Sequence, residues 1–113
     1  MGYKIKSRIW IEVENNVLLG EGRVQLLKAI DETGSLSKAA KSMNISYKKA
    51  WGLLDSINKS AKKPVTINTI GGKGGGGAEL TDYGKALILA FDDINQKCWA
   101  FLDEQLEKIE NLE

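Results

Sequence analysis

The chain has 113 residues, a length typical of one domain with a modest core. Hydrophobic residues make up 42% of it, which excludes disorder by composition, and no apolar run approaches the roughly 20 residues of a membrane helix. One cysteine and no histidine exclude an intrachain disulfide and remove the commonest general base and metal ligand. No secretory signal pattern follows the N-terminal methionine, so we expect a cytoplasmic protein without membrane association. Because the sequence has no histidine and no paired-carboxylate pattern, we also expect no metal, cofactor or enzymatic activity.

The net charge of +1 conceals a strong segregation of charge along the chain. Residues 35–77 contain eight lysines and one acid, whereas residues 81–113 contain three lysines and eight acids. A basic region beside an acidic tail is the electrostatic pattern of a DNA-binding module. An ordinary solvated face would give the same counts, so charge alone does not separate the two interpretations.

The N-terminal third reads as a hairpin followed by a helix. Polar and apolar residues alternate over residues 3–13, which predicts a strand, and residues 14–16 have the composition of a turn. Residues 17–19 then predict a short returning strand. The apolar spacing over residues 20–33 predicts a helix, with Gly34 as its C-terminal stop.

The next segment has the pattern of a helix-turn-helix. Ser35 is placed to cap a helix over residues 36–43, and Asn44 suits a left-handed turn. Ala39 and Ala40 are small enough for two helices to cross closely. Ser46 is placed to cap a second helix that runs to about residue 61.

The second helix of this pattern divides into two predicted faces. Trp51, Leu54 and Ile57 are expected to face the core, whereas Tyr47, Lys48 and Lys49 fall on the exposed first turn. In helix-turn-helix proteins, the first residues of the second helix reach base edges in the major groove. The alternative is a plain helical hairpin with a lysine-rich solvent face.

A predicted hairpin follows this helix. Residues 65–70 alternate and are rich in β-branched types, residues 71–77 read GGKGGGG, and residues 78–80 predict a second strand. A hairpin directly after a recognition helix is a wing. Glycine lets its tip approach DNA closely, and Lys73 would contact a phosphate.

The glycine loop also satisfies the dinucleotide-binding pattern G-x-G-x-x-G, through Gly72, Gly74 and Gly77. A dinucleotide site needs a βαβ unit, however, and no second parallel strand is expected after this loop. The match is weak because five of the six positions are glycine. Nucleotide binding therefore remains a minor alternative.

The C-terminal part predicts one long helix over residues 81–112, capped by Thr81. Its apolar seam comprises Leu87, Phe91, Ile94, Cys98, Phe101, Leu102, Leu106 and Ile109. Such a helix would be about 50 Å long, whereas a compact domain of this size is about 25–30 Å across. We therefore expect its first half to pack on its own domain and its second half to pair with another subunit, with Trp99 beside the seam and Cys98 as a packed thiol.

The segment from Gly34 to Gly84 resembles the DNA-binding domain of the molybdate-responsive ModE regulators, a winged-helix relative of the LysR-type regulators. The Ile-Ser-Tyr-Lys-x-Ala-Trp run of residues 45–51, the glycine loop and the Tyr83-Gly84 pair carry the resemblance. It implies a homodimeric transcription factor that binds double-stranded DNA. Asp82 departs from the family, in which a basic residue is common beside the wing.

A second departure is larger. ModE proteins also carry molybdate-binding domains, for which this sequence has no matching region. The chain is thus a stand-alone regulator, one with its sensor on a separate polypeptide, or a piece of a longer protein.

These observations predict a single α+β, mainly helical, winged helix-turn-helix domain over residues 1–113, with an N-terminal β-hairpin and a long C-terminal dimerisation helix. Residues 46–61 form the expected recognition helix, and residues 65–80 form the wing. A protein-interaction module that uses the apolar C-terminal helix is the main alternative. The residues expected at the DNA are Ser35, Ser37, Lys38, Ser46, Tyr47, Lys48, Lys49 and Lys73.

Overall fold

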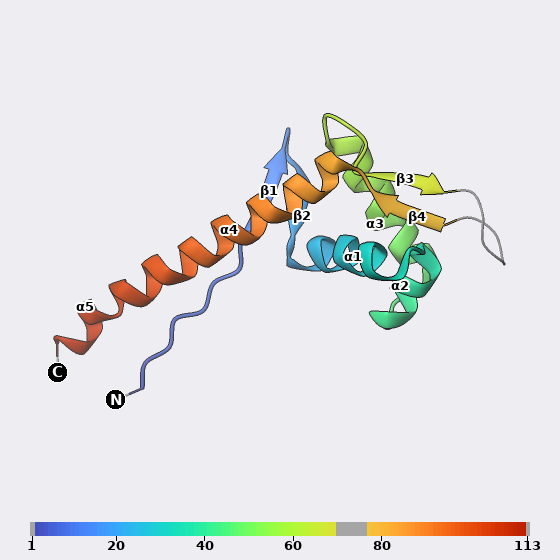
Figure 1. The fold of residues 1–113 in the computed structure, drawn as a ribbon. Coiled ribbons are helices and arrows are strands. Elements are labelled where there is room, and N and C mark those ends of the chain that lie inside the picture. The colour runs from blue at the N-terminus through green and yellow to red at the C-terminus, as the bar shows by residue number, and fades with distance from the viewer. Residues whose placement is uncertain (1, 70–76, 113) are drawn as a thin grey trace.

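A computed structural model describes residues 2–69 and 77–112. The architecture is α+β and mainly helical (Figure 1). Its elements in chain order are β1 (Trp10–Val13), β2 (Asn16–Gly20), α1 (Glu21–Thr33), α2 (Leu36–Ser42), α3 (Tyr47–Ser60), β3 (Thr66–Thr69), β4 (Gly77–Leu80), α4 (Asp82–Gln105) and α5 (Glu107–Glu110).

The N-terminal hairpin is present, but its first strand is shorter than predicted. β1 and β2 are antiparallel, and Glu14 and Asn15 take positive φ in the turn between them. The pairing begins at Trp10 opposite Gly20, because β2 ends there and α1 starts at the next residue. Residues 2–9 therefore lie outside the hairpin, and the prediction of a strand over residues 3–13 is wrong for that part.

Three helices form one half of the core. α1 ends as predicted at Gly34, which has φ 70° and donates its backbone N–H to the Ile30 carbonyl at 2.7 Å. α2 crosses α1 and α3 through small buried side chains, among them Ala39, Ala40 and Ala50. The small side chains allow the close crossing that the sequence predicted.

Trp51 does not belong to this core, contrary to prediction. Its side chain is 53% exposed, whereas Ala50 and Ile57 are fully buried. At ~100° per residue, Ile57 lies about 20° around the helix from Ala50 and about 120° from Trp51. The buried stripe of α3 therefore passes through Ala50, and Trp51 lies beside the exposed Tyr47.

The wing packs against α1 and the start of α4, and a side-chain hydrogen bond joins it to α3. β3 and β4 are antiparallel, with Thr66 opposite Leu80 and Thr69 opposite Gly77. Val65, at the base of the wing, is completely buried. Gly84 lies against it so closely that a Cβ there would clash with the Val65 carbonyl oxygen.

Helix α4 packs on its own domain and then projects beyond it (Figure 1). Gly84, Ile88 and Phe91 are buried, while Ile94 and Phe101 farther along are exposed. The molecule is accordingly elongated, with extents of 62 × 28 × 22 Å. The burial follows the predicted division between the two halves of the helix.

The predicted continuous helix over residues 81–112 is interrupted. At Leu106 the backbone N–H bonds the Asp103 carbonyl, three residues back, at 3.2 Å. This tighter turn separates α4 from the short α5, which holds no buried residue.

Candidate nucleic-acid interface

The N-terminus of α3 presents four predicted site residues together. Ser46 caps the helix, and its hydroxyl accepts a hydrogen bond from the Lys49 backbone N–H at 3.0 Å. Tyr47, Lys48 and Lys49 are exposed on the first turn, and Tyr47 is 56% exposed. The positive end of the helix dipole and two lysine ammonium groups thus lie at the same solvent-exposed end of α3.

The turn before α3 is held by local interactions. Asn44 has φ 56°, the left-handed conformation expected of it. The next residue, Ile45, donates its backbone N–H to the Ala40 carbonyl at 3.1 Å and packs against the small-residue core. These bonds fix the direction in which α3 leaves α2.

The predicted residues at the start of α2 are also accessible. The Ser35 hydroxyl accepts a hydrogen bond from the Lys38 backbone N–H at 3.2 Å, as a helix cap does. Ser37 and Lys38 are exposed on the first turn. Both helix starts of the helix-turn-helix are therefore capped and open to solvent.

Some of the lysines in and near α3 have interaction partners, and others do not. Lys59 forms an ion pair with Asp55 at 2.9 Å, and the Lys63 ammonium lies 5.9 Å from the centroid of the Tyr83 ring. In the described part of the chain, Lys48 and Lys49 have no ion-pair partner. Their charge is thus available to an external anion.

A cleft between α3 and β3 adds residues that the sequence did not assign to a site. It has a volume of about 210 Å³. Trp51 and Asn68, at its two sides, are both exposed. Sequence reasoning missed Trp51 because the indole was counted in the core, although its spacing of four from Tyr47 places both on one face.

The predicted contact of Lys73 lies outside the described residues, as does most of the glycine loop. The strands beside it are described and antiparallel, so the part of the chain around the loop does not contain the βαβ unit of a dinucleotide site. The described residues also contain no group of three metal-binding side chains.

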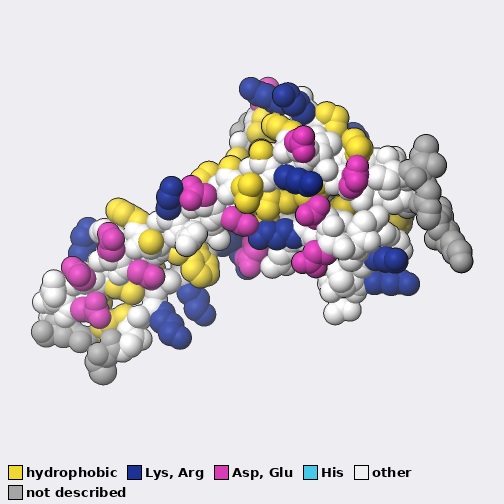
Figure 2. All heavy atoms as spheres, in the orientation of Figure 1, with side chains coloured by type: hydrophobic (Ala, Val, Ile, Leu, Met, Phe, Trp, Pro, Cys, Tyr) yellow, Lys and Arg dark blue, Asp and Glu magenta, His cyan; other side chains and the backbone are white. Residues whose placement is uncertain are grey.

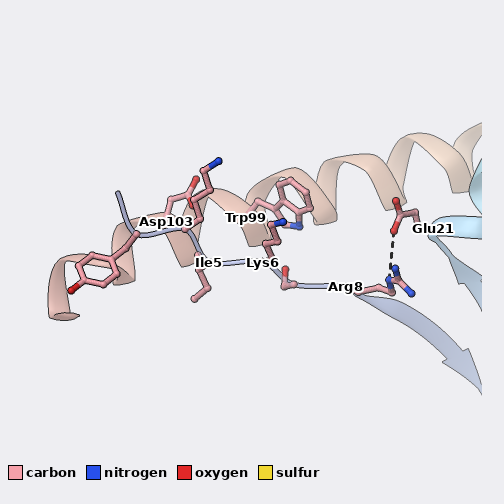
Figure 3. Close-up of a pocket in the computed structure, with 9 residues that line it drawn as sticks. Ile5, Lys6, Arg8, Glu21, Trp99 and Asp103 are labelled. Atoms are coloured by element: carbon pink, nitrogen blue, oxygen red, sulfur yellow. Dashed lines mark ion pairs between the residues drawn. The ribbon is translucent and has the colours of Figure 1, made fainter. Parts of the chain in front are cut away.

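A second surface lies along α4, away from α3. Residues 3–8 run beside the helix and enclose with it a groove of about 730 Å³ that includes Trp99 and Asp103 (Figure 3). Arg8 closes one end through an ion pair with Glu21, with its Nε 3.6 Å from the carboxylate. Hydrophobic side chains continue along the projecting helix, among acidic ones toward its C-terminal end (Figure 2).

One partly buried charge connects α1 to α3. The Arg23 guanidinium donates to the Ser56 hydroxyl at 3.0 Å, and partial burial lowers the pKa of Arg23. Elsewhere on α1, Lys28 pairs with Asp92 of α4 at 2.8 Å. Both contacts help to hold α1 between α3 and α4. Among the described helices, none is long and apolar enough to cross a membrane.

Comparison with characterised proteins supports the predicted resemblance. The chain is 33% identical over 103 residues to the molybdenum transport protein ModE of Azotobacter vinelandii, covering 91% of this chain and 38% of that protein. It is 37% identical over 97 residues to the DNA-binding transcriptional dual regulator ModE of Escherichia coli K12, covering 83% and 37%. It is also 46% identical over 76 residues to the molybdenum-pterin-binding protein MopB of Rhodobacter capsulatus, covering 67% and 28%. No family model matches the sequence.

Solved structures share the fold at low sequence identity. The DNA-binding domain of CbnR, solved in complex with DNA, aligns with a TM-score of 0.57 and 17% identity, over 78% of this chain and 95% of that domain. ArgP from Mycobacterium tuberculosis aligns with a TM-score of 0.54 and 16% identity, over 75% and 30%. The chain spans two-fifths or less of the length of the ModE proteins it matches. With this sequence similarity and this winged helix-turn-helix fold, the chain is a homologue of the ModE transcriptional regulators.

Proposed function

We propose that this protein binds duplex DNA in a sequence-specific manner and regulates transcription. We also propose that it is located in the cytoplasm and that residues 1–113 form one winged-helix domain. The observation that carries the proposal is the capped, solvent-exposed N-terminus of α3, with Tyr47, Lys48 and Lys49 on its first turn. The similarity to regulators named ModE, one of them described as DNA-binding, supports it.

The chemistry of the proposed interface follows from the residue types. Tyr47, Lys48 and Lys49 would enter the major groove, where hydroxyl and ammonium groups reach acceptors on the base edges. Ser35, Ser37 and Lys38, at the start of α2, would bind the backbone together with Ser46. Lys73 in the wing would bind a further phosphate. We propose no catalytic step, and the ModE relative of Escherichia coli is named a regulator.

A homodimer is part of the same proposal. The exposed apolar side chains of the projecting part of α4 include Ile94, Trp99 and Phe101. A single chain leaves this apolar surface uncovered. A two-fold pairing of these helices would present two copies of α3 to successive turns of the duplex, about 34 Å apart. A sensor on a separate polypeptide is compatible with this arrangement.

The test is DNA binding by fluorescence anisotropy, with a duplex enriched from a random library and with unselected duplex as competitor. We expect tight, selective binding whose affinity falls steeply with salt. Replacing Lys48 and Lys49 with alanine should weaken selective binding by about 1–3 kcal/mol for each lysine that reads a base edge.

The matched control is the removal of two lysines from the acidic C-terminal region, Lys97→Ala with Lys108→Ala. It changes the net charge equally, at a distance from α3. Equal decreases in affinity in both double variants would show a general effect of charge and contradict the assignment of α3.

A protein-interaction module is the second candidate, because the exposed apolar face of α4 is itself an interaction surface. A stable complex with another protein, together with no DNA binding at about 50 mM salt, would favour it over DNA binding.

A further inference from the structure

The cleft between α3 and β3 presents two hydrogen-bond donors without partners in the described chain. The indole N–H of Trp51 has no acceptor there, whereas that of Trp10 donates to the Glu12 carboxylate at 2.8 Å. The side-chain amide of Asn68 is exposed and also lacks a partner among the described residues. Both side chains border the same cleft of about 210 Å³.

The floor of this cleft is held in place because Asn58 connects α3 to the wing. Its side-chain oxygen accepts a hydrogen bond from the buried Val65 N–H at 2.7 Å, and its amide donates to the Thr66 hydroxyl at 3.2 Å. Thr66 and Asn68 are two residues apart on β3, so they lie on one face of the strand, toward α3. Asn58 is therefore engaged in structural bonds, while Trp51 and Asn68 stay available.

The cleft is lined by a single charged side chain, an acidic one. Its one acid, Asp55, forms an ion pair with Lys59 at 2.9 Å. An anion in the cleft would thus meet neutral donors and a compensated carboxylate, and no unpaired ammonium group. This distinguishes the cleft from the first turn of α3, where Lys48 and Lys49 supply positive charge.

We propose that one phosphodiester strand of bound DNA lies in this cleft and accepts hydrogen bonds from the Trp51 indole N–H and the Asn68 amide. The inference rests on the proposed DNA-binding function. A protein that inserts a helix into the major groove and applies a hairpin to the neighbouring backbone or minor groove must straddle the strand between the two grooves. Here the space between those two elements is the cleft bordered by Trp51 and Asn68.

The proposal makes Trp51 and Asn68 contributors to affinity that carry no sequence information. Hydrogen bonds to phosphate position a protein on the duplex, and bonds to base edges select the sequence. Because both donors are neutral, their removal should leave the salt dependence unchanged. Removal of a lysine that contacts a phosphate should instead reduce the salt dependence of the affinity, because fewer counterions are then released from the DNA on binding.

The test uses Trp51→Phe, which keeps an aromatic ring and removes the N–H, and Asn68→Ala. Each variant should bind both selected and unselected duplex about tenfold more weakly, the equivalent of ~1.4 kcal/mol. The ratio of the two affinities and the slope of affinity against salt should both stay at the wild-type values. Trp10→Phe, which removes another exposed indole N–H outside the cleft, is the matched control and should bind as wild type does.

Three results would overturn the proposal. Wild-type affinity in either cleft variant would show that the cleft holds no DNA strand, while leaving the proposed function intact. A decrease confined to the selected duplex would show that the side chain reads bases, and a salt slope reduced by about one would show that a charged group had been displaced from a phosphate. Absence of binding by the wild-type protein would instead remove the proposed function together with this inference.

Discussion

At the scale of single residues, two glycines illustrate how conformation and position decide the effect of a side chain. Gly34 has φ 70° and its carbonyl accepts a hydrogen bond from the Ala78 backbone N–H at 3.0 Å, whereas Gly52 lies inside α3 with open space around it. Gly34→Ala should lower the free energy of unfolding by about 1–2 kcal/mol, because an L-residue is strained in the left-handed region. Gly52→Ala should raise it by about 1 kcal/mol through helix propensity. Urea unfolding followed by circular dichroism measures both, and changes of the same sign would contradict this account.

At the scale of elements, Thr81 connects the wing to α4. Its hydroxyl accepts a hydrogen bond from the Gly84 backbone N–H at 3.0 Å and donates to the Pro64 carbonyl at 2.7 Å. Thr81→Ala should lower the free energy of unfolding by about 1–2 kcal/mol, because the first turn of α4 loses its cap. Thr81→Ser keeps the hydroxyl and should recover most of that stability in the same urea titration. If serine and alanine destabilise equally, the missing methyl group and not the cap explains the effect.

At the scale of the whole molecule, the projecting part of α4 should determine the oligomeric state. Phe101 is 59% exposed on this helix, so an aspartate there leaves the core of the domain intact. Phe101→Asp should convert the proposed homodimer into a folded monomer, because a dimer interface would have to bury the new charge unpaired. Sedimentation or light scattering gives the mass, and Gln96→Asp places the same charge at a polar position of the same helix. A dimer that persists in Phe101→Asp would place the interface elsewhere.

Many of the predicted features that the structure contains are local ones. Ser35, Ser46 and Thr81 cap their helices, and Gly34 and Asn44 take the left-handed conformations expected of them. Each of these depends on bonds within about four residues along the chain. A residue type and its near neighbours are enough to predict them.

The exposed site on α3 was predictable for the same reason, since a cap places the residues that follow it on the first turn. The amino-acid sequence alone was therefore enough for the order of the elements, most of their ends, and the candidate recognition residues Tyr47, Lys48 and Lys49. Long-range packing was needed to establish that Trp51 faces solvent beside β3 and that residues 2–9 lie outside the hairpin. These two outcomes depend on which segments, distant in sequence, come to lie against each face. An apolar or alternating pattern shows that a face can be covered without showing what covers it.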